Sequence, residues 1–302
     1  MSDAASSSKP LTLYPPALLH KLFTSHQPNA SLSHLSRLLS TPNGIDRALM
    51  FVQYTSALLS SQLARLLNLY LQHLATRFAA NASSSLLPNE KVIATFPAPP
   101  VAARLASTIA SAKAATALCS DVRAALRLWG LLGMWAWARG TYLAPPKDTL
   151  VKLLTWGQIC VNTSYYVLEH GAYLAGKGVI RGWSAEQIGE RWRIATMCFG
   201  AHVGMEFVRL ARVRSLRVQE RAAQRGQLKS GVDGRDGEIA GLEKDEDLKW
   251  MTALQINAAY APLCVHWSTP GGFVSDTVYG LLGSAAAFSY VRPLWAAAAA
   301  PA

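Results

Sequence analysis

Residues 45–78 read IDRALMFVQYTSALLSSQLARLLNLYLQHLATRF, and this stretch decides the fold. Its apolar side chains recur at steps of three, four or seven residues, which is the spacing of one face of an α-helix. Polar and charged side chains, from Asp46 to Thr76, lie on the opposite face. The sequence therefore predicts one long helix whose apolar stripe consists of Ile45, Leu49, Val52, Leu59, Leu63, Leu66, Tyr70, Leu74 and Phe78. Such a helix either packs on its neighbours or lies in a lipid interface.

A second, alanine-rich helical run covers residues 101–129. Its bases outnumber its single acid, Asp121. Each base near an anionic membrane contributes about 1 kcal/mol of binding, and each buried Leu-sized side chain contributes about 1.5–3 kcal/mol. We therefore predict that this helix lies on a membrane surface. The candidate membrane-binding residues are Arg104, Leu105, Ile109, Lys113, Val122, Arg123, Leu126 and Arg127.

Three later stretches are long and poor in charge. Residues 128–138 are uncharged, but a membrane span needs about 20 residues. Residues 150–174 are a candidate span, with a buried or re-entrant helix as the alternative. Residues 273–295 are the strongest candidate, because Arg292 and Trp295 stand at their end as interface anchors. Within them, the Gly-Leu-Leu-Gly at 280–283 permits close helix packing.

Charge is concentrated between residues 207 and 249, where a basic segment precedes an acidic one that also contains glycines. We interpret about 215–248 as a charged, flexible loop that faces the cytosol. A basic helix end followed by a linker is the alternative. We also expect a disordered tail over residues 1–30, followed by a single helical domain over residues 31–302.

The composition favours a membrane partner. Apolar residues make up 51 % of the 302 residues, charged residues only 16 %, and the net charge is +11. Mean hydropathy is +0.15, which fits a few embedded segments together with interfacial helices. The excess of base suits anionic lipid. No fold signature or basic stripe with interleaved aromatics indicates nucleic acid.

The sequence shows no catalytic motif, and we expect neither an enzyme nor a bound cofactor or metal. The four cysteines are far apart, and no histidine pair has ligand spacing. No nucleophile elbow, phosphate-binding loop or dinucleotide fingerprint is present. Three polar residues in apolar surroundings, Glu169, His170 and Asp276, are more typical of packing than of chemistry.

Four segments, in this order and spacing, resemble the peroxin-11 family of peroxisomal biogenesis factors, in a fungal-type form. Residues 38–47 read LLSTPNGIDR and are followed by FVQY at 51–54; residues 122–128 read VRAALRL; residues 165–170 read YYVLEH; and residues 271–276 read GGFVSD. The residues that carry the family motif are Gly44, Asp46, Arg47, Gln53, Tyr54, Gly272 and Ser275.

The resemblance implies an all-α membrane protein with long amphipathic helices, located in the peroxisomal membrane. It implies a non-enzymatic role, in which amphipathic helices bend and elongate the membrane and so promote peroxisome proliferation and fission. Expected partners are anionic phospholipids, further copies of the chain and the organelle fission machinery. The alternative function is a small-molecule channel or carrier, which would need several spans lined by polar groups.

Overall fold

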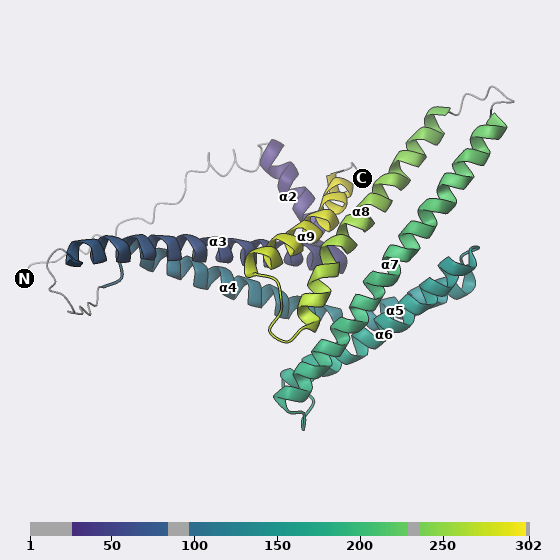
Figure 1. Ribbon diagram of the computed structural model, residues 1–302. Helices are drawn as coiled ribbons and strands as arrows, with labels where there is room; N and C mark the ends of the chain where they lie inside the picture. The colour runs from purple at the N-terminus through teal and green to yellow at the C-terminus, as the bar shows by residue number, and fades with distance from the viewer. Residues whose placement is uncertain (1–25, 84–96, 229–235, 300–302) are drawn as a thin grey trace, which may run out of the picture.

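The computed structural model describes residues 26–83, 97–228 and 236–299, which form helices and no strand (Figure 1). The prediction of an all-α fold is confirmed for these residues. In chain order the helices are α2 (His26–Leu39), α3 (Pro42–Ser83), α4 (Pro100–Arg127), α5 (Gly130–Leu143), α6 (Thr149–Gly176), α7 (Ala185–Leu228), α8 (Asp236–Ser268) and α9 (Asp276–Ala299). The long helices predicted at 45–78 and 101–129 correspond to α3 and α4.

Helices α3 and α4 pack side by side as an antiparallel hairpin, which we call the arm (Figure 1). The buried and half-buried residues of α4 together recur mainly at steps of three and four, a period that keeps one side of a helix against a partner. Ala102, Ala112, Cys119 and Arg123 are buried, and Leu105 and Ile109 are half-buried in the same register. The apolar stripe of α4 is therefore the inner seam of the arm.

Helix α9 lies along the base of α3, and glycines allow the close approach. A Cβ atom built on Gly280 would lie 2.7 Å from the backbone nitrogen of Leu58. One built on Gly283 would lie 2.0 Å from Cδ1 of Tyr54. The predicted packing role of the Gly-Leu-Leu-Gly segment is confirmed, although its partner is α3 of the same chain.

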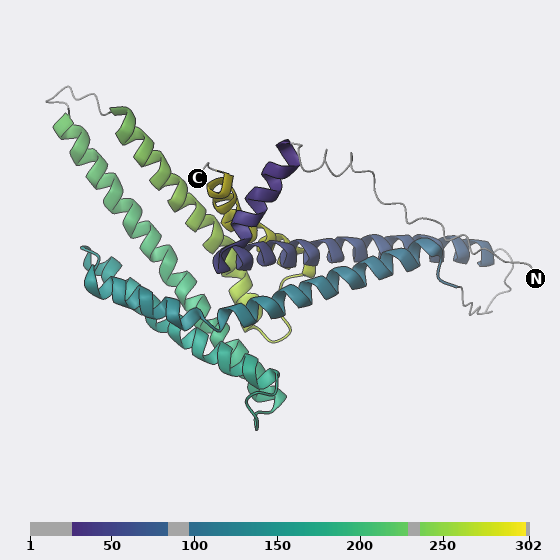
Figure 2. The ribbon, with the colours of Figure 1, turned by 180° about the vertical axis from the view of Figure 1, so that it is seen from behind.

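The core lies where α3, α7, α8 and α9 meet. Helix α8 passes between α7 and α9 and joins the arm to the second half of the molecule, in which α6 packs along α7 and α5 lies on α6 (Figure 2). Met50 and Leu263 are fully buried there. The buried residues of this core are Met50, Tyr54, Val203, Ile256, Ala259, Tyr260, Leu263, Cys264, Ala286 and Ala287.

The expectation of one or two transmembrane helices is wrong for the described residues. None of their helices combines the length and the apolar character that crossing a bilayer requires. In α6 the reason is a polar stripe at steps of three and four, all buried except the half-buried Tyr165: Thr155, Gln158, Asn162, Tyr165 and Glu169. In α9 the reason is the number of small and polar residues, which include Gly280, Gly283, Ser284 and Ser289.

The charged loop expected at about 215–248 is wrong for its described part, because residues 215–228 continue α7 and residues 236–248 begin α8. Residues 229–235 of this prediction lie outside the described residues. The two segments run antiparallel, and their opposite charges meet. The Arg214 guanidinium pairs with Asp247, and Nη1 of Arg221 donates to Oδ2 of Asp247 at 3.0 Å. Arg217 lies 3.7 Å from the Glu246 carboxylate. The basic and the acidic runs are separate in the sequence, whereas the fold pairs their side chains across two helices.

The N-terminal tail expected over residues 1–30 falls mostly outside the described residues. Its last five residues, 26–30, form the first turn of α2 instead. That helix packs on α9 and α3. The single domain expected over 31–302 stays a prediction.

We predict opposite effects for the same substitution at two helical glycines. Gly280→Ala should lower the free energy of unfolding by about 1–3 kcal/mol, because the new methyl group meets the Leu58 backbone. Gly204→Ala should raise it by about 0.5–1 kcal/mol, because nothing lies within 4 Å of that Cβ position and alanine favours the helix. Thermal unfolding of the two purified variants measures both. Equal shifts would contradict this packing of α9 on α3.

Candidate functional site

Two arginines one helical turn apart on α4 form the centre of the candidate site, which we call the arginine junction. The first, Arg123, is 7 % exposed and points toward α3. Its Nε donates to Oδ1 of Asp46 at 2.9 Å, and its Nη1 donates to Oε1 of Gln53 at 2.8 Å. Both acceptors lie on α3, so this guanidinium fastens the base of the arm.

The second arginine, Arg127, reaches away from the arm to α6. Its Nε and Nη2 both donate to the Glu169 carboxylate, at 3.0 and 2.7 Å, in the bidentate geometry that makes such pairs strong. The Tyr165 hydroxyl donates to Oε1 of the same carboxylate at 2.7 Å. Nε2 of His170 lies 2.8 Å from the backbone oxygen of Arg127. These contacts hold α4 against α6, where the two helices otherwise touch little.

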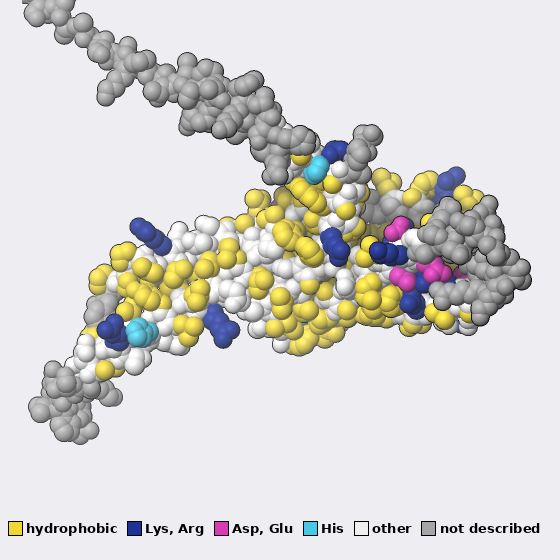
Figure 3. Space-filling view, turned by 90° about the horizontal axis from the view of Figure 1, so that it is seen from above, with side chains coloured by type: hydrophobic (Ala, Val, Ile, Leu, Met, Phe, Trp, Pro, Cys, Tyr) yellow, Lys and Arg dark blue, Asp and Glu magenta, His cyan; other side chains and the backbone are white. Residues whose placement is uncertain are grey.

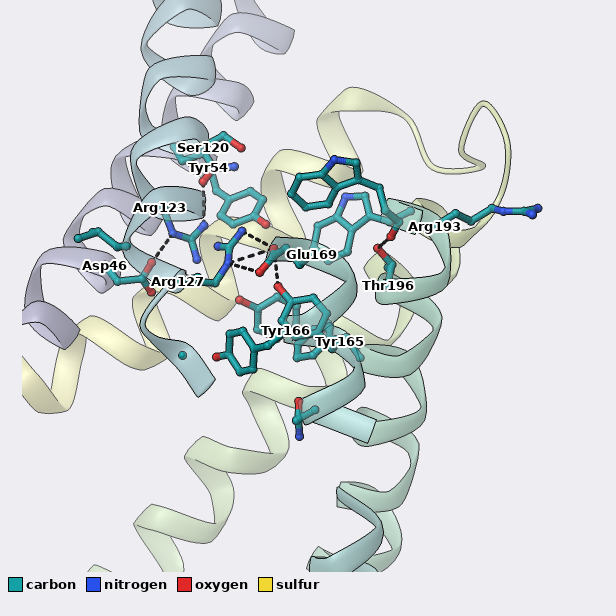
Figure 4. Close-up of a pocket in the computed structure, with 18 of the residues that line it drawn as sticks. Asp46, Tyr54, Ser120, Arg123, Arg127, Tyr165, Tyr166, Glu169, Arg193 and Thr196 are labelled. Carbon is teal, nitrogen blue, oxygen red and sulfur yellow. Dashed lines mark hydrogen bonds and ion pairs between the residues drawn. The ribbon is translucent and has the colours of Figure 1, made fainter. Parts of the chain in front are cut away.

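An open cleft of about 1440 Å³ adjoins the junction (Figure 4). Asp46, Arg123, Arg127 and Glu169 lie on one side of it, and Arg193 of α7 points away from them. Its wall includes tyrosines from four helices, namely Tyr54, Tyr165, Tyr166, Tyr260, Tyr279 and Tyr290. The cleft is thus lined by paired charges and phenol rings.

Electrostatics favour a structural role for the junction. Burial opposes the charge on Arg123, but attraction to Asp46 and its hydrogen bond outweigh burial and raise its pKa. The same balance, with Tyr165 and Glu169 as the attracting groups, raises the pKa of Arg127. Burial raises the pKa of Tyr54 and Tyr165, so both phenols stay protonated. The two guanidinium groups of the junction therefore hold fixed charge that is paired with carboxylates.

Four of the seven residues of the family motif, Asp46, Arg47, Gln53 and Tyr54, line the cleft beside this junction. Asp46 and Gln53 bind Arg123, Tyr54 packs under Gly283, and the Arg47 guanidinium lies 3.7 Å from the centroid of the Tyr290 ring on α9. A Cβ atom at Gly44 would lie 1.8 Å from the backbone oxygen of Leu38, so glycine permits the tight turn from α2 into α3.

The last two motif residues shape the turn before α9. Gly272 has φ +69°, a conformation that favours glycine, and a Cβ atom there would lie 2.1 Å from the His266 ring. The Ser275 hydroxyl accepts a hydrogen bond from the backbone N–H of Val278 at 3.4 Å, as an N-cap residue does. All seven motif residues thus orient α2, α3, α4 or α9.

The eight candidate membrane-binding residues separate into different environments. Arg104 and Lys113 are exposed on the outer side of α4, and Val122 is 38 % exposed. Leu105, Ile109 and Leu126 are half-buried. Arg123 and Arg127 are held in the junction and do not face outward, which does not fit a contact with lipid heads. A base at a seam position looks the same in sequence as a base on an exposed face.

The outer face of α3 carries a row of exposed apolar side chains. Val52, Leu59, Leu66 and Leu69 are 45 %, 51 %, 55 % and 54 % exposed. Seen from above, hydrophobic side chains cover much of the arm, with Lys, Arg and His near its edges (Figure 3). Residues 55–83 and 97–120 contain four Arg or Lys and no Asp or Glu. In the described part of the arm beyond the junction, every Lys, Arg, Asp or Glu side chain is therefore a base.

A second polar cluster, which was not predicted from the sequence, lies between α6 and α7. Nε2 of Gln158 donates to the Glu206 carboxylate at 2.7 Å, and Nε of Arg209 donates to the same oxygen at 2.7 Å. One turn along, Nδ2 of Asn162 lies 2.7 Å from Nδ1 of His202. The steps of three and four between the polar residues of α6 were a readable signal.

Comparison with known proteins identifies the family. The model of the peroxisomal biogenesis factor 11 family matches residues 102–295, which is well over half of the chain. The chain belongs to the peroxisomal biogenesis factor 11 family. The matched region begins in α4 and ends in α9, so it includes both arginines of the junction. No curated protein and no solved structure matches the chain.

Membership in the peroxisomal biogenesis factor 11 family confirms the resemblance seen in the sequence. It also confirms the predicted location in the peroxisomal membrane. Proteins of this family are peroxisomal membrane proteins that serve peroxisome biogenesis. The fungal-type subgroup stays a prediction. Glu169 and His170, two of the three polar residues that the sequence places in apolar surroundings, both contact Arg127.

We predict that neutralising one partner of the junction destabilises the fold. Glu169→Gln should lower the free energy of unfolding by about 2–3 kcal/mol, because it leaves the Arg127 charge unpaired. The loss stays below that of a fully buried pair, because 26 % of the Arg127 side chain is exposed. Chemical denaturation measures it.

Asp121→Asn is the matched control. It removes the same charge from a pair with Lys177 in which both side chains are about half exposed, so its effect should be much smaller. Similar losses for the two variants would contradict a structural junction.

We predict an acid-sensitive step in stability from His202. Burial lowers the pKa of His202, with Glu206 opposing and Arg209 assisting the shift. The unfolded chain therefore binds more protons just below pH 6.5, and the free energy of unfolding falls as the pH falls through that value. His202→Gln should flatten the difference between pH 7.5 and pH 5.5, whereas His73→Gln, on the exposed surface of α3, should keep it. Retention of the whole difference in His202→Gln would contradict the assignment.

Proposed function

We propose that this protein remodels and elongates the peroxisomal membrane by laying its arm on the cytosolic leaflet. The observation that carries the proposal is the outer face of the arm. It combines exposed leucines on α3 with bases and lacks any acid over the described residues beyond the junction. Apolar side chains fringed by bases are typical of helices that lie in the interface of an anionic membrane.

The energies of the two contributions are sufficient for stable binding. Leu59, Leu66 and Leu69 would each contribute about 1.5–3 kcal/mol when fully withdrawn from water. Arg65, Arg77, Arg104 and Lys113 would each add about 1 kcal/mol near anionic lipid heads. Because the three leucines are about half exposed already, half of each leucine value is counted, and with the four bases the sum is about 6–8 kcal/mol. One myristoyl chain, which binds membranes only marginally, contributes about 5.5 kcal/mol.

The length of the arm explains how binding to a membrane would also bend it. Helix α3 has 42 residues and is therefore about 63 Å long. A rod of this length inserted at the depth of the headgroups expands one leaflet and not the other, which favours curvature. The bidentate pair of Arg127 with Glu169 fixes the arm to the rest of the molecule, so the inserted face keeps its orientation.

The proposed membrane-inserting surface lies on α3, whereas the sequence predicted it on α4. The stripe of α4 that contains Leu105 and Ile109 faces α3, so the leucines on the outer side of α3 take over the apolar contact. Arg104 and Lys113 keep the predicted role at the lipid heads. Arg123 and Arg127 position the arm and do not bind lipid.

We predict that Leu59→Glu/Leu66→Glu weakens binding to anionic vesicles at least about tenfold, because two side chains no longer favour the lipid. Co-sedimentation of the purified full-length chain with vesicles of phosphatidylcholine and phosphatidylinositol measures the affinity. Electron microscopy of the same vesicles reports tubulation, which should be lost in parallel.

The matched control is Leu59→Met/Leu66→Met, which keeps the apolar area and should bind and tubulate as the natural chain does. Circular dichroism verifies that all variants remain helical. If the glutamate variant bound and tubulated normally, and restored peroxisome number in cells that lack the protein, the proposed function would be abandoned.

A further inference from the structure

Helix α5 has an unusual surface for its sequence. It is the most apolar helix of the described chain, yet Thr141 is its single buried residue. Its large side chains lie outside: Leu132 is 65 % exposed, Trp135 is 66 % exposed and Tyr142 is 76 % exposed. Trp129, the residue before the helix, is 72 % exposed. A helix that is apolar all round is normally covered on every side, by protein or by lipid.

The inner side of α5 is anchored to the rest of the molecule. A Cβ atom at Gly130 would lie 2.3 Å from Cε1 of Tyr166, so the helix begins in close contact with α6. The rings of Trp137 and His202 meet edge to face, with centroids 6.5 Å apart. The outer apolar side is therefore held in place and has no cover from the described residues.

The charges around α5 have one sign. Arg139, Lys147 and Lys152 are exposed, and no acidic side chain of the described chain forms an ion pair with any of them. The Arg139 guanidinium lies 5.9 Å from the centroid of the Trp135 ring. The one acid between residues 128 and 168 is Asp148, and Arg212 binds it at 2.7 Å. The surface that α5 presents is thus apolar with a basic edge.

We propose that α5 is a second membrane-binding site, a monotopic helix that lies in the headgroup region of an anionic bilayer. With 14 residues it is about 21 Å long, too short to cross a hydrocarbon core of about 30 Å. Trp129, Trp135 and Tyr142 supply the amphipathic rings that settle at the boundary between lipid tails and water. The three bases meet lipid phosphates.

Lipid fits this surface better than a second copy of the chain. In a two-fold contact between α5 helices, both copies would contribute the same basic side chains and neither would contribute an acid. Such a contact would concentrate the charges of Arg139, Lys147 and Lys152 from both copies at one interface, with no acid to compensate. An anionic bilayer supplies the opposite charge and an apolar layer together.

This inference rests on the proposed function only in taking a membrane as the partner, since α5 and the arm are separate surfaces. The first test is Leu132→Glu/Trp135→Glu in the full-length chain, with vesicles of phosphatidylcholine and phosphatidylinositol. Affinity should fall at least about tenfold, with unchanged helicity. The matched control, Leu242→Glu/Leu248→Glu on α8, alters residues of 62 % and 55 % exposure and should bind normally.

Depth gives a second, independent readout. Phosphatidylcholine brominated on its acyl chains quenches tryptophans that reach the tails, and Trp129→Phe/Trp135→Phe should remove much of that quenching. Trp250→Phe should not, because the Trp250 indole donates to the backbone oxygen of Leu210 within the protein.

The outcomes separate the two membrane sites. Loss of binding by the α5 variant supports the inference, whether or not Leu59→Glu/Leu66→Glu also loses binding. Normal binding by the α5 variant, with quenching unchanged in Trp129→Phe/Trp135→Phe, would overturn it even if the arm variant failed. A change in oligomeric state of Leu132→Glu/Trp135→Glu at unchanged vesicle affinity would also overturn it, in favour of a contact between copies.

Discussion

The pairing of Arg123 and Arg127 with acceptors on two different helices is the constraint on which the arrangement of the molecule depends. The two residues are four positions apart, so both guanidinium groups leave the same side of α4. One binds Asp46 and Gln53 on α3, and the other binds Glu169 on α6. A buried charge that loses its partner is costly, so any rotation of α4 that broke one pair would be penalised. The junction thereby sets the angle at which the arm leaves the rest of the chain.

The distribution of polarity follows from that arrangement. Polar side chains occupy the seams between helices, as in the stripe of α6 that meets Glu206 and His202 of α7. Large apolar side chains lie on the outer faces of α3 and α5 instead. In water this arrangement leaves apolar area unburied, and contact with lipid recovers that free energy. A protein that works at a membrane surface can therefore be held together by hydrogen bonds and ion pairs at its seams.

Tyrosines and glycines near the junction pack closely and help to hold the arm in position. Tyr54 is buried beneath Gly283, while Tyr165 binds the Glu169 carboxylate. Because each phenol stays protonated, these contacts keep their character across the physiological pH range. A separate polar cluster, between α6 and α7, contains His202, whose pKa is lowered by burial.

Sequence by itself determined the helical class, the long helices α3 and α4, the close packing at Gly280 and Gly283, and the family through ordered motifs. It did so because period and glycine spacing are local properties of the chain. Tertiary structure alone decided which apolar stripe was a seam and which was a surface, since Leu105 and Leu59 look alike in sequence. It also paired the basic and acidic runs of α7 and α8, and showed that the polar stripe of α6 binds other helices. These features depend on contacts between residues that are far apart in the chain, so no local sequence pattern predicts them.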